Sequence, residues 1–474
     1  MRKSVTVALA FVGLLVGAGF ASGQETIQYF LAYGYWGIVG AIVAGITIVV
    51  VGASLFQLGS YYLADDHSAV FRNVSYPVVS TFMDVATMLT LFSIGFVMIA
   101  GGGSNLEQQF GFPTWVGSAI LTFFLILSGF LDVDKLTRVI SAITPFLILA
   151  VLAALVVTIL NMPENIGGLN ELAMQNEPTS GVFNNWLISA LNYASLCVIM
   201  AVSMILVIAG SQLNPREAGV GGLIGGMLFA SLLVILVFII FLNMESAFGA
   251  DFPLLMVFNS MHPAVGIVVS IVIYMMVYNT AVGMFYAMSR RLTASHPERF
   301  RPVYFTVVLI GFALSFIGFA DLVSWVYPVL GYLGMALIVV MVIGWINGRA
   351  GIRAETRRRE RLASLAATAL DPGEDDLTSA QRREIEKLVD ESNVADTHLW
   401  QSVQEEVAAD LDADSSSEFS LEDNPALNPE ADSYNGAPTP SDAPINWAAY
   451  EKMYETGSFP AVSPADKSKD TDGR

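Results

Sequence analysis

The sequence predicts an all-α polytopic membrane protein with ten transmembrane helices and an acidic tail. Hydrophobic residues make up 54% of the chain and charged residues only 14%, a composition that suits a lipid environment. Charge is unevenly distributed, since residues 1–346 carry 10 Lys+Arg and 15 Asp+Glu, whereas residues 347–474 carry 13 and 27. We therefore expect a membrane core over residues 1–346 and a cytoplasmic tail over residues 347–474.

Ten apolar stretches are long enough, or nearly so, to cross a hydrocarbon core of ~30 Å as helices. Only helices suit these segments, because lipid offers no partner to unpaired backbone amides. The expected spans are residues 4–33, 37–62, 78–102, 114–131, 136–160, 185–210, 219–242, 263–289, 303–319 and 322–346.

The basic residues of the core indicate its orientation, because Lys and Arg resist translocation. In the ten-span arrangement all ten fall on one side: Arg2, Lys3, Arg72, Lys135, Arg138, Arg216, Arg290, Arg291, Arg299 and Arg301. We expect a multi-pass protein of the cell membrane with both termini in the cytoplasm. A cleaved signal peptide is the alternative for the start, although the apolar segment resumes at Tyr29 and is long for a signal core.

The tail is acidic and poor in aliphatic residues, so we expect it to be mostly disordered. Short helical segments are the exception, and Thr378 with Gln381 has the pattern of a capping box. Three aromatic residues farther on would share one helical face: Trp447, Tyr450 and Tyr454. That face is either a docking motif for a cytoplasmic protein partner or an incidental cluster.

Six arginines follow the last span: Arg349, Arg353, Arg357, Arg358, Arg359 and Arg361. They either bind anionic head groups of the lipid bilayer, at roughly 1 kcal/mol per charge, or serve only as a topology anchor.

The first span is too long for one regular helix, because residues 4–33 would extend about 45 Å. Its middle is rich in small residues: Gly17, Ala18, Gly19, Phe20, Ala21, Ser22 and Gly23. Each glycine costs ~1 kcal/mol of helix stability relative to alanine, so we expect a break near the bilayer centre. Freed amides there would bind an anionic group of a solute, and freed carbonyls a cation. Close helix packing through small residues is the alternative.

The sixth span corresponds to the first if the ten spans form two halves of five, with the second half inverted in the membrane. Asn192, Tyr193 and Ser195 lie about 12 Å from its outer end. Their side chains either line the same cavity or hydrogen-bond neighbouring helices. In the seventh span, four glycines predict a packing seam: Gly221, Gly222, Gly225 and Gly226.

The eighth span carries Asn279 and Thr280 roughly 15 Å from the cytoplasmic boundary. Their oxygens, with the Met276 carbonyl one turn earlier, would coordinate a small cation such as Na⁺, and interhelical hydrogen bonding is the alternative. Two acids are candidates for a gate or for carrying H⁺. Glu25 follows the first break and could equally face a solvated vestibule. Asp84 lies in the third span, where we favour snorkelling towards the cytoplasm.

Several function classes are excluded by composition. One cysteine, Cys197, rules out an intramolecular disulfide framework, and the four histidines do not cluster as a metal site would. A net charge of −19 argues against nucleic acid as a partner. No span supplies a nucleophile with its base, a metal cluster or a phosphate loop. We therefore expect no enzymatic activity and no cofactor beyond a coupling ion, Na⁺ or H⁺.

Four segments resemble the YkvI-like family of bacterial membrane proteins. They are VGAGFASGQE at residues 16–25, MIAGGG at 98–103, EQQFG at 107–111 and NTAVG at 279–283. The similarity covers about residues 1–346 and leaves out the tail. This family is placed in the amino acid-polyamine-organocation superfamily, so the resemblance implies a LeuT-like 5+5 inverted repeat with broken first and sixth helices.

The resemblance also implies a place for a coupling ion. In such folds a sodium site joins first-helix carbonyls to eighth-helix oxygens, which here would be residues near Gly17 and Phe20 with Asn279 and Thr280. Sodium-independent relatives place a lysine in the fifth helix, and residues 139–160 contain none, which favours an ion.

Taken together, these features predict a secondary active transporter coupled to Na⁺ or H⁺. Its solute would be a small molecule, an amino acid or a related carboxylate or amine, bound by residues 17–23 with Tyr193 and Ser195. Alternating access would occur around the breaks in the first and sixth helices. The alternative is a membrane-anchored solute sensor or scaffold that signals through the cytoplasmic tail.

Overall fold

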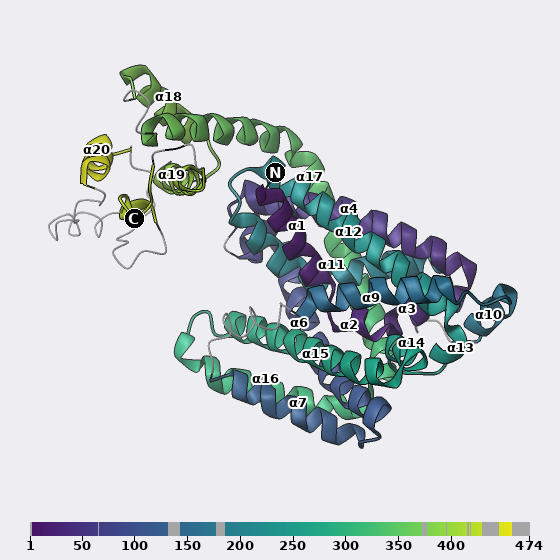
Figure 1. Cartoon of the computed structure of the whole chain (residues 1–474). Coiled ribbons are helices and arrows are strands. Elements are labelled where there is room, and N and C mark those ends of the chain that lie inside the picture. Colours follow the sequence, from purple (N-terminus) through teal and green to yellow (C-terminus); the bar gives the residue numbers. More distant parts are fainter. Residues whose placement is uncertain are drawn as a thin grey trace. The chain divides into compact units, whose positions relative to one another are not determined.

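The computed structural model describes residues 2–64, 66–130, 143–176, 185–371, 377–394, 396–414, 417, 419–428 and 445–456. Within these residues every regular element is a helix (Figure 1). The chain divides into two compact units. Unit 1 comprises Met1–Phe56, Asp66–Ile208 and Glu217–Ile346, and unit 2 comprises Gln57–Asp65, Ala209–Arg216 and Asn347–Arg474.

The helices up to the end of the last predicted span are α1 (Arg2–Leu15), α2 (Ala18–Ser22), α3 (Gln24–Tyr29), η1 (Leu31–Tyr33), α4 (Tyr35–Tyr61), α5 (His67–Val74), α6 (Pro77–Phe110), α7 (Thr114–Ser128), α9 (Ile143–Leu160), α10 (Ile166–Ala173), α11 (Trp186–Gly210), α12 (Pro215–Leu242), α13 (Met244–Ala247), α14 (Pro253–Met261), α15 (Pro263–Leu292), η2 (Pro297–Arg299), α16 (Phe300–Leu314), η3 (Ser315–Ile317) and α17 (Phe319–Leu370). The later elements are α18 (Ser379–Asp390), α19 (Asp396–Asp412), η4 (Pro425–Leu427) and α20 (Trp447–Thr456).

Seven helical segments are long and apolar enough to cross a membrane: Tyr35–Tyr61, Pro77–Phe110, Trp186–Gly210, Pro215–Leu242, Pro263–Leu292, Pro297–Ile317 and Phe319–Leu370. Three shorter apolar helices, Lys3–Leu15, Thr114–Ser128 and Thr144–Leu160, lie in the predicted first, fourth and fifth spans. The connection at 131–142, with Lys135 and Arg138, lies outside the described residues. The number ten, the inverted repeat and the orientation of the termini stay predictions.

The third predicted span, α6, packs against α7, α15 and α16 (Figure 1). Glycines permit the close approach, since a Cβ added at Gly117 would lie 2.8 Å from the Gly102 carbonyl oxygen. A polar contact is buried in the same interface, where Ser270 donates to the Asn105 side-chain oxygen at 3.0 Å. These contacts hold α15, which carries the predicted ion ligands.

The glycine seam predicted in the seventh span is confirmed. A Cβ added at Gly225 would lie 2.6 Å from the Ala8 carbonyl oxygen of α1, and one at Gly226 would lie 2.8 Å from the Val49 Cα of α4. Only glycine leaves room for these neighbouring backbones. The start of the first span is therefore packed directly against α12.

The described residues of the tail include the short helices that the sequence predicts, and α17 also extends into the tail as far as Leu370. The end of α17 and the helices α18, α19 and α20 contribute to one hydrophobic core, in which Trp400 is fully buried. The capping box of Thr378 and Gln381 is confirmed at the start of α18. The sequence has few aliphatic residues here, but their helical spacing lets them meet on one side of each helix.

The aromatic face at the end of the tail is part of this core. The rings of Trp400 and Trp447 lie 6.1 Å apart, and the Trp447 indole donates to Glu386 at 2.7 Å. Tyr450 is buried beside them. These two rings therefore pack within unit 2, and docking of a cytoplasmic partner stays a prediction. The Tyr454 side chain lies outside the described residues.

Candidate functional site

The predicted interruption of the first helix is confirmed. α1 ends at Leu15, Gly17 is extended (φ −98°, ψ −167°), and α2 is a short helix that ends at Gly23 in the left-handed region (φ 78°). Glycine adopts that conformation without the Cβ clash that other residues meet. α3 continues from there to Tyr29. The backbone therefore changes course twice within the segment singled out by its glycines.

Each glycine of the break has a different neighbour. A Cβ added at Gly17 would lie 3.6 Å from the Thr280 Oγ1, and one at Gly19 would lie 1.7 Å from the Glu25 Oε1. At Gly23 the neighbours are apolar, since a Cβ would lie 2.7 Å from the Ile240 side chain. Gly23 thus serves helix packing, whereas Gly17 and Gly19 expose backbone to polar side chains. The packing interpretation therefore applies at Gly23, and binding of a solute or cation by the break stays a prediction.

The remaining residues of the break are held in place by buried contacts. Ser22 donates to the Gly19 carbonyl oxygen at 2.8 Å and accepts from the Gln24 amide at 3.1 Å. Phe20 and Ala21 are buried, and the Phe20 ring lies 5.8 Å from that of Phe229. The side chain of Ala18 lies outside the described part of the chain.

Glu25 does not face a solvated vestibule, because only 5% of its surface is exposed. Its carboxylate lies over the Cα of Gly19 and forms a hydrogen bond with the Tyr193 side chain. Tyr193 comes from α11 and was predicted to line the site. The structure therefore brings the polar residue of the sixth predicted span to the break in the first.

Hydrogen bonds connect α3 with α11 and α17 around this carboxylate. The Tyr29 hydroxyl donates to the Asn192 side-chain oxygen at 3.2 Å, and the Asn192 amide donates to the Pro328 carbonyl oxygen at 3.0 Å. Ser189 donates to the Tyr29 carbonyl oxygen at 2.7 Å. These buried bonds fix the wall of the site. The role of Tyr29 was missed, although it lies one turn after Glu25 and therefore on the same helix face.

The predicted break in the sixth helix is wrong, since α11 is continuous from Trp186 to Gly210. The helix contains no proline and no glycine before its last residue, so nothing forces the backbone to unwind. Ser195 donates to the carbonyl oxygen of Leu191 in its own helix at 2.7 Å. This hydrogen bond satisfies the Ser195 hydroxyl, and α11 contributes to the site through the Tyr193 side chain.

The predicted ion ligands lie on one stretch of α15. Thr280 is next to Gly17, Met276 is buried, and Asn279 is half-buried. The hydroxyl of Thr280 and the backbone of the break thus meet from two different helices. Such oxygens are the donor type that a hard cation prefers.

Asp84 joins an ion-pair cluster that sequence reasoning missed. Arg291 at the end of α15 binds Asp66 at 2.5 Å and Asp84 at 3.2 Å. Ser68 donates to Asp84 at 2.8 Å and also contacts Arg291. The available signal was an acidic residue, Asp66, in a connection predicted to be positive. Asp84 is therefore held by protein partners as well as by solvent.

The cluster also contains a histidine whose charge is controlled by its surroundings. Burial lowers the pKa of His67, so the neutral form is favoured near pH 7. Its ring lies 2.5 Å from the Ser203 hydroxyl of α11. Partial burial acts to raise the pKa of Asp66, but the Ser68 amide and the charges of His67 and Arg291 lower it overall. The cluster thus joins the start of α5 to three long helices.

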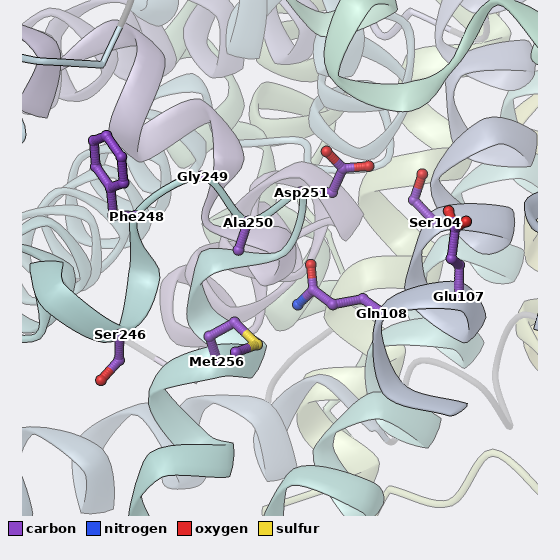
Figure 2. Close-up of a pocket in the computed structure, with 9 residues that line it drawn as sticks. All are labelled: Ser104, Glu107, Gln108, Ser246, Phe248, Gly249, Ala250, Asp251 and Met256. Carbon is purple, nitrogen blue, oxygen red and sulfur yellow. The ribbon is translucent and has the colours of Figure 1, made fainter. Parts of the chain in front are cut away.

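A cavity of about 410 Å³ lies elsewhere in unit 1. Ser104, Glu107 and Gln108 of α6 line one side, and residues around α13 and α14 line the other (Figure 2). Gln108 fixes this opening through two hydrogen bonds with the Phe252 backbone, at 3.0 and 2.9 Å. None of the predicted site residues lines this cavity.

Comparison with known proteins identifies relatives of this chain and solved structures with a similar fold. No family model matches the chain. It is 23% identical over 338 residues to the uncharacterized membrane protein YkvI of Bacillus subtilis, covering 70% of this chain and 93% of YkvI. It is 25% identical over 349 residues to the uncharacterized protein YyaD of the same organism, covering 72% of this chain and 97% of YyaD. The chain is homologous to both.

Among solved structures, the inward-facing conformation of Mhp1 matches with a TM-score of 0.51 and 14% identity, covering 73% of this chain and 77% of Mhp1. A second structure of Mhp1, described as a nucleobase-cation-symport-1 family transporter, shows a closed conformation with bromovinylhydantoin bound. It also matches with a TM-score of 0.51, at 15% identity, and covers 77% of this chain and 86% of that structure. At this identity the likeness concerns the fold alone. The present chain is therefore a helical membrane protein with the fold of Mhp1. This fold is consistent with the LeuT-like class that the sequence predicts.

Proposed function

We propose that this protein is a secondary active transporter of a small solute, coupled to Na⁺ or H⁺. One observation carries the proposal: the first helix is broken where Gly17 and Gly19 meet the Thr280 hydroxyl and the Glu25 carboxylate. Polar groups inside a membrane protein are costly and mark solute or ion paths. The fold shared with Mhp1, a nucleobase-cation-symport-1 family transporter, supports the same conclusion.

In this proposal the break in the first helix is the main moving part. Glycines at both ends of α2 let the two halves of the helix tilt separately. The continuous α11 supplies a rigid wall, with Tyr193 directed at the site. Alternating access then requires motion of α1 to α3 against α11, α15 and α17, which differs from the two-break scheme expected from the resemblance.

Uptake by proteoliposomes tests the transport proposal. The purified full chain is reconstituted and given labelled amino acids, amines and carboxylates, with an inward gradient of Na⁺ or of H⁺. We expect at least one solute to accumulate above its equilibrium level only while a gradient is present. Equal uptake with and without gradients, or no uptake from any class, would overturn the proposal.

The coupling ion has a test of its own in Thr280. Its hydroxyl lies beside Gly17, so Thr280→Ala removes one oxygen from the proposed ion site. We expect the Na⁺ concentration for half-maximal uptake to rise about tenfold, the change that corresponds to one lost contact of roughly 1.4 kcal/mol. Thr306→Ala is the control, since Thr306 is exposed and bonds its own helix at Pro302. Identical sodium titrations of Thr280→Ala and the unmodified protein would rule out this ion site.

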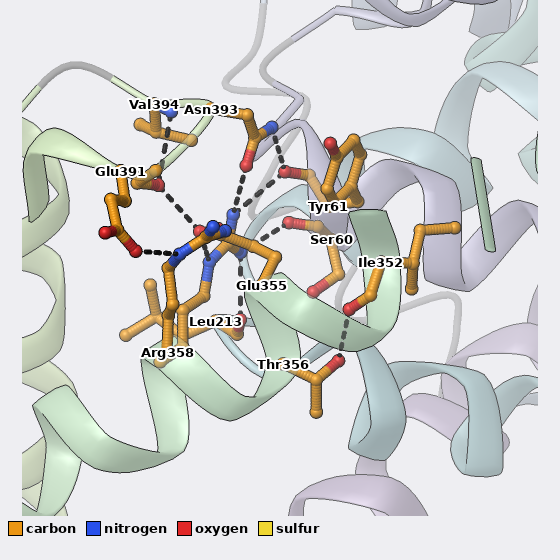
Figure 3. A network of polar contacts seen from close by, with 12 residues as sticks. Ser60, Tyr61, Leu213, Ile352, Glu355, Thr356, Arg358, Glu391, Asn393 and Val394 are labelled. Carbon is orange, nitrogen blue, oxygen red and sulfur yellow. Dashed lines mark hydrogen bonds and ion pairs between the residues drawn. The ribbon is translucent and has the colours of Figure 1, made fainter. Parts of the chain in front are cut away.

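A second candidate, a solute sensor, is favoured by an observation in unit 2. Arg359 donates to the carbonyl oxygens of Ser60 at 2.8 Å, Tyr61 at 2.8 Å and Leu213 at 2.9 Å (Figure 3). Ser60 and Tyr61 lie at the end of α4, Leu213 lies between α11 and α12, and all three belong to unit 2. The tail is thus bonded to the ends of membrane helices, as a signalling device would need to be.

Two of the arginines near Arg359 also have carboxylate partners within the chain. Arg358 pairs with Glu355 at 3.0 Å, and Arg361 pairs with Glu384 at 2.8 Å. Deleting residues 363–474 separates the two functions. Intact uptake by the truncated chain supports transport by the core, whereas a chain that binds solute without uptake, and loses a tail-dependent response, supports the sensor.

A further inference from the structure

The carboxylate of Glu25 lies against Gly19, in the part of the break where the sequence analysis predicts an anionic group of the solute. Its Oε1 lies where a side chain on Gly19 would begin, 1.7 Å from an added Cβ. The backbone of the break therefore already faces a carboxylate that is covalently part of the chain. A second carboxylate brought by a solute would be repelled by the first in a low-dielectric site.

The described surroundings of Glu25 are rich in aromatic rings. Tyr29 and Tyr193 lie with ring centroids 5.4 Å apart, and Phe30 lies 4.9 Å from Tyr193. Tyr327 of α17 is fully buried, and its hydroxyl has no hydrogen-bond partner among the residues that the structure describes. Among the described residues, no Lys, Arg or His forms an ion pair with Glu25.

A buried carboxylate without a cation is costly, and a cationic ligand removes that cost. Rings of tyrosine add cation–π attraction, which suits an organic ammonium ion. A multivalent metal ion fits less well, because no group of three His, Cys, Asp or Glu residues that could hold one is present in the described part of the chain. The unpartnered Tyr327 hydroxyl can accept a hydrogen bond from an ammonium N–H.

We propose that the solute is an organic amine in its ammonium form, and that Glu25 is its counter-ion. This inference rests on the proposed function for the same site, and it narrows the substrate class from amino acids, carboxylates and amines to amines. The ammonium group lies between the Glu25 carboxylate and the rings of Tyr29, Tyr193 and Tyr327. The apolar remainder of the solute contacts the aromatic surface.

A proton and the ammonium ion compete for the same carboxylate in this arrangement. The titratable groups that face Glu25 are Tyr29, Tyr193, Cys197 and Tyr327, all of which are neutral when protonated. Binding of the cation requires the charged carboxylate, so it displaces a proton from Glu25 when that group is protonated. The affinity for amines therefore falls as the pH falls.

A charge series of one chain length tests the inference with the unmodified protein. The probes are n-butylammonium, n-butanol and n-butyrate, and binding to the purified full chain is measured by calorimetry at about pH 6 and about pH 8. We expect n-butylammonium to bind, more weakly at the lower pH, with proton release shown by different heats in two buffers. We expect n-butyrate and n-butanol to bind at least about 30-fold more weakly.

Single substitutions test which residues are responsible for the binding of n-butylammonium. Glu25→Gln keeps the side-chain shape and removes the charge, so n-butylammonium binding should weaken at least about 30-fold and lose its pH dependence. Glu245→Gln, at an exposed carboxylate of α13, is the matched control and should bind as the unmodified chain does. Tyr327→Phe should weaken n-butylammonium about tenfold but leave tetramethylammonium, which has no N–H, unchanged.

The outcomes separate this inference from the transport proposal. Preferential binding of n-butyrate, or equal n-butylammonium binding by Glu25→Gln and the unmodified chain, overturns the amine assignment even if gradient-driven uptake of another solute is found. Binding of n-butylammonium that depends on Glu25, without any uptake, supports the amine site and contradicts the transport function.

Discussion

Arg359 in unit 2 and Glu25 in unit 1 are both buried charged side chains, and the two are surrounded very differently. Arg359 in unit 2 is 2% exposed and has a carboxylate partner, Glu355, at 2.8 Å, besides the three carbonyl oxygens of Figure 3. Glu25 in unit 1 is 5% exposed and has a tyrosine hydroxyl and a glycine surface as neighbours. In the described residues no cation of the chain pairs with it.

The difference indicates what each group is for. A buried charge whose hydrogen-bonding capacity is used up by the protein holds the structure together. A buried charge that lacks its counter-ion lowers the stability of the folded chain. Such a charge is kept where a ligand, an ion or a proton completes the site. This contrast supports a structural role for Arg359 and the functional role that we propose for Glu25.

The largest expected effect is on stability in unit 2. Glu355→Gln leaves the Arg359 guanidinium buried without its carboxylate, and removing one member of such a pair costs about 3–5 kcal/mol. Glu25→Gln should change stability by no more than about 1 kcal/mol, since it breaks no ion pair. Native-state proteolysis of the tail and thermal unfolding of the whole chain measure the two effects. Comparable losses in both variants would remove the distinction between the two charges.

A smaller effect, on uptake, is expected from a substitution at Gly19, which faces the Glu25 carboxylate. Gly19→Ala places a Cβ 1.7 Å from the present position of the Glu25 Oε1, so the carboxylate must move. We expect gradient-driven uptake to fall about tenfold, because polar groups must be held within about 0.5 Å of their working positions. Gly13→Ala in α1 is the matched control, since an added Cβ there has no neighbour within 4 Å. Unchanged uptake in Gly19→Ala would show that the carboxylate position is not critical.

The sequence predicts the membrane core well where the signal is local. Apolar length identifies the long helices, and the glycines at 17, 19 and 23 identify the break, because each effect depends on a few adjacent residues. The burial of Glu25 was not predictable in this way. It depends on Tyr193 and Tyr327, which lie far away in the sequence and reach the carboxylate only through tertiary packing.

One expectation was wrong for a physical reason that the sequence does contain. The sixth-helix break came from the family resemblance, although residues 186–209 contain neither glycine nor proline to unwind them. The tail was expected to be mostly disordered with short helical segments, and α18, α19 and α20 are such segments. Its apolar residues are few, but Ile385, Val389 and Trp400 fall at spacings that place them in one core. Pattern thus outweighs composition in this segment.

The smallest expected effect concerns an exposed ion pair of the same unit. Arg361 binds Glu384 with two hydrogen bonds, at 2.8 and 3.0 Å, in a geometry as regular as that of Arg359. Both side chains are well exposed, however, so solvent and salt screen the pair, and Arg361→Gln should cost less than about 1 kcal/mol in tail stability. The loss should shrink further at high salt, whereas the effect of Glu355→Gln should persist. If Arg361→Gln destabilised the tail as much as Glu355→Gln, hydrogen-bond geometry rather than burial would determine how much each ion pair contributes to stability. The argument from burial that supports a function for Glu25 would then fail.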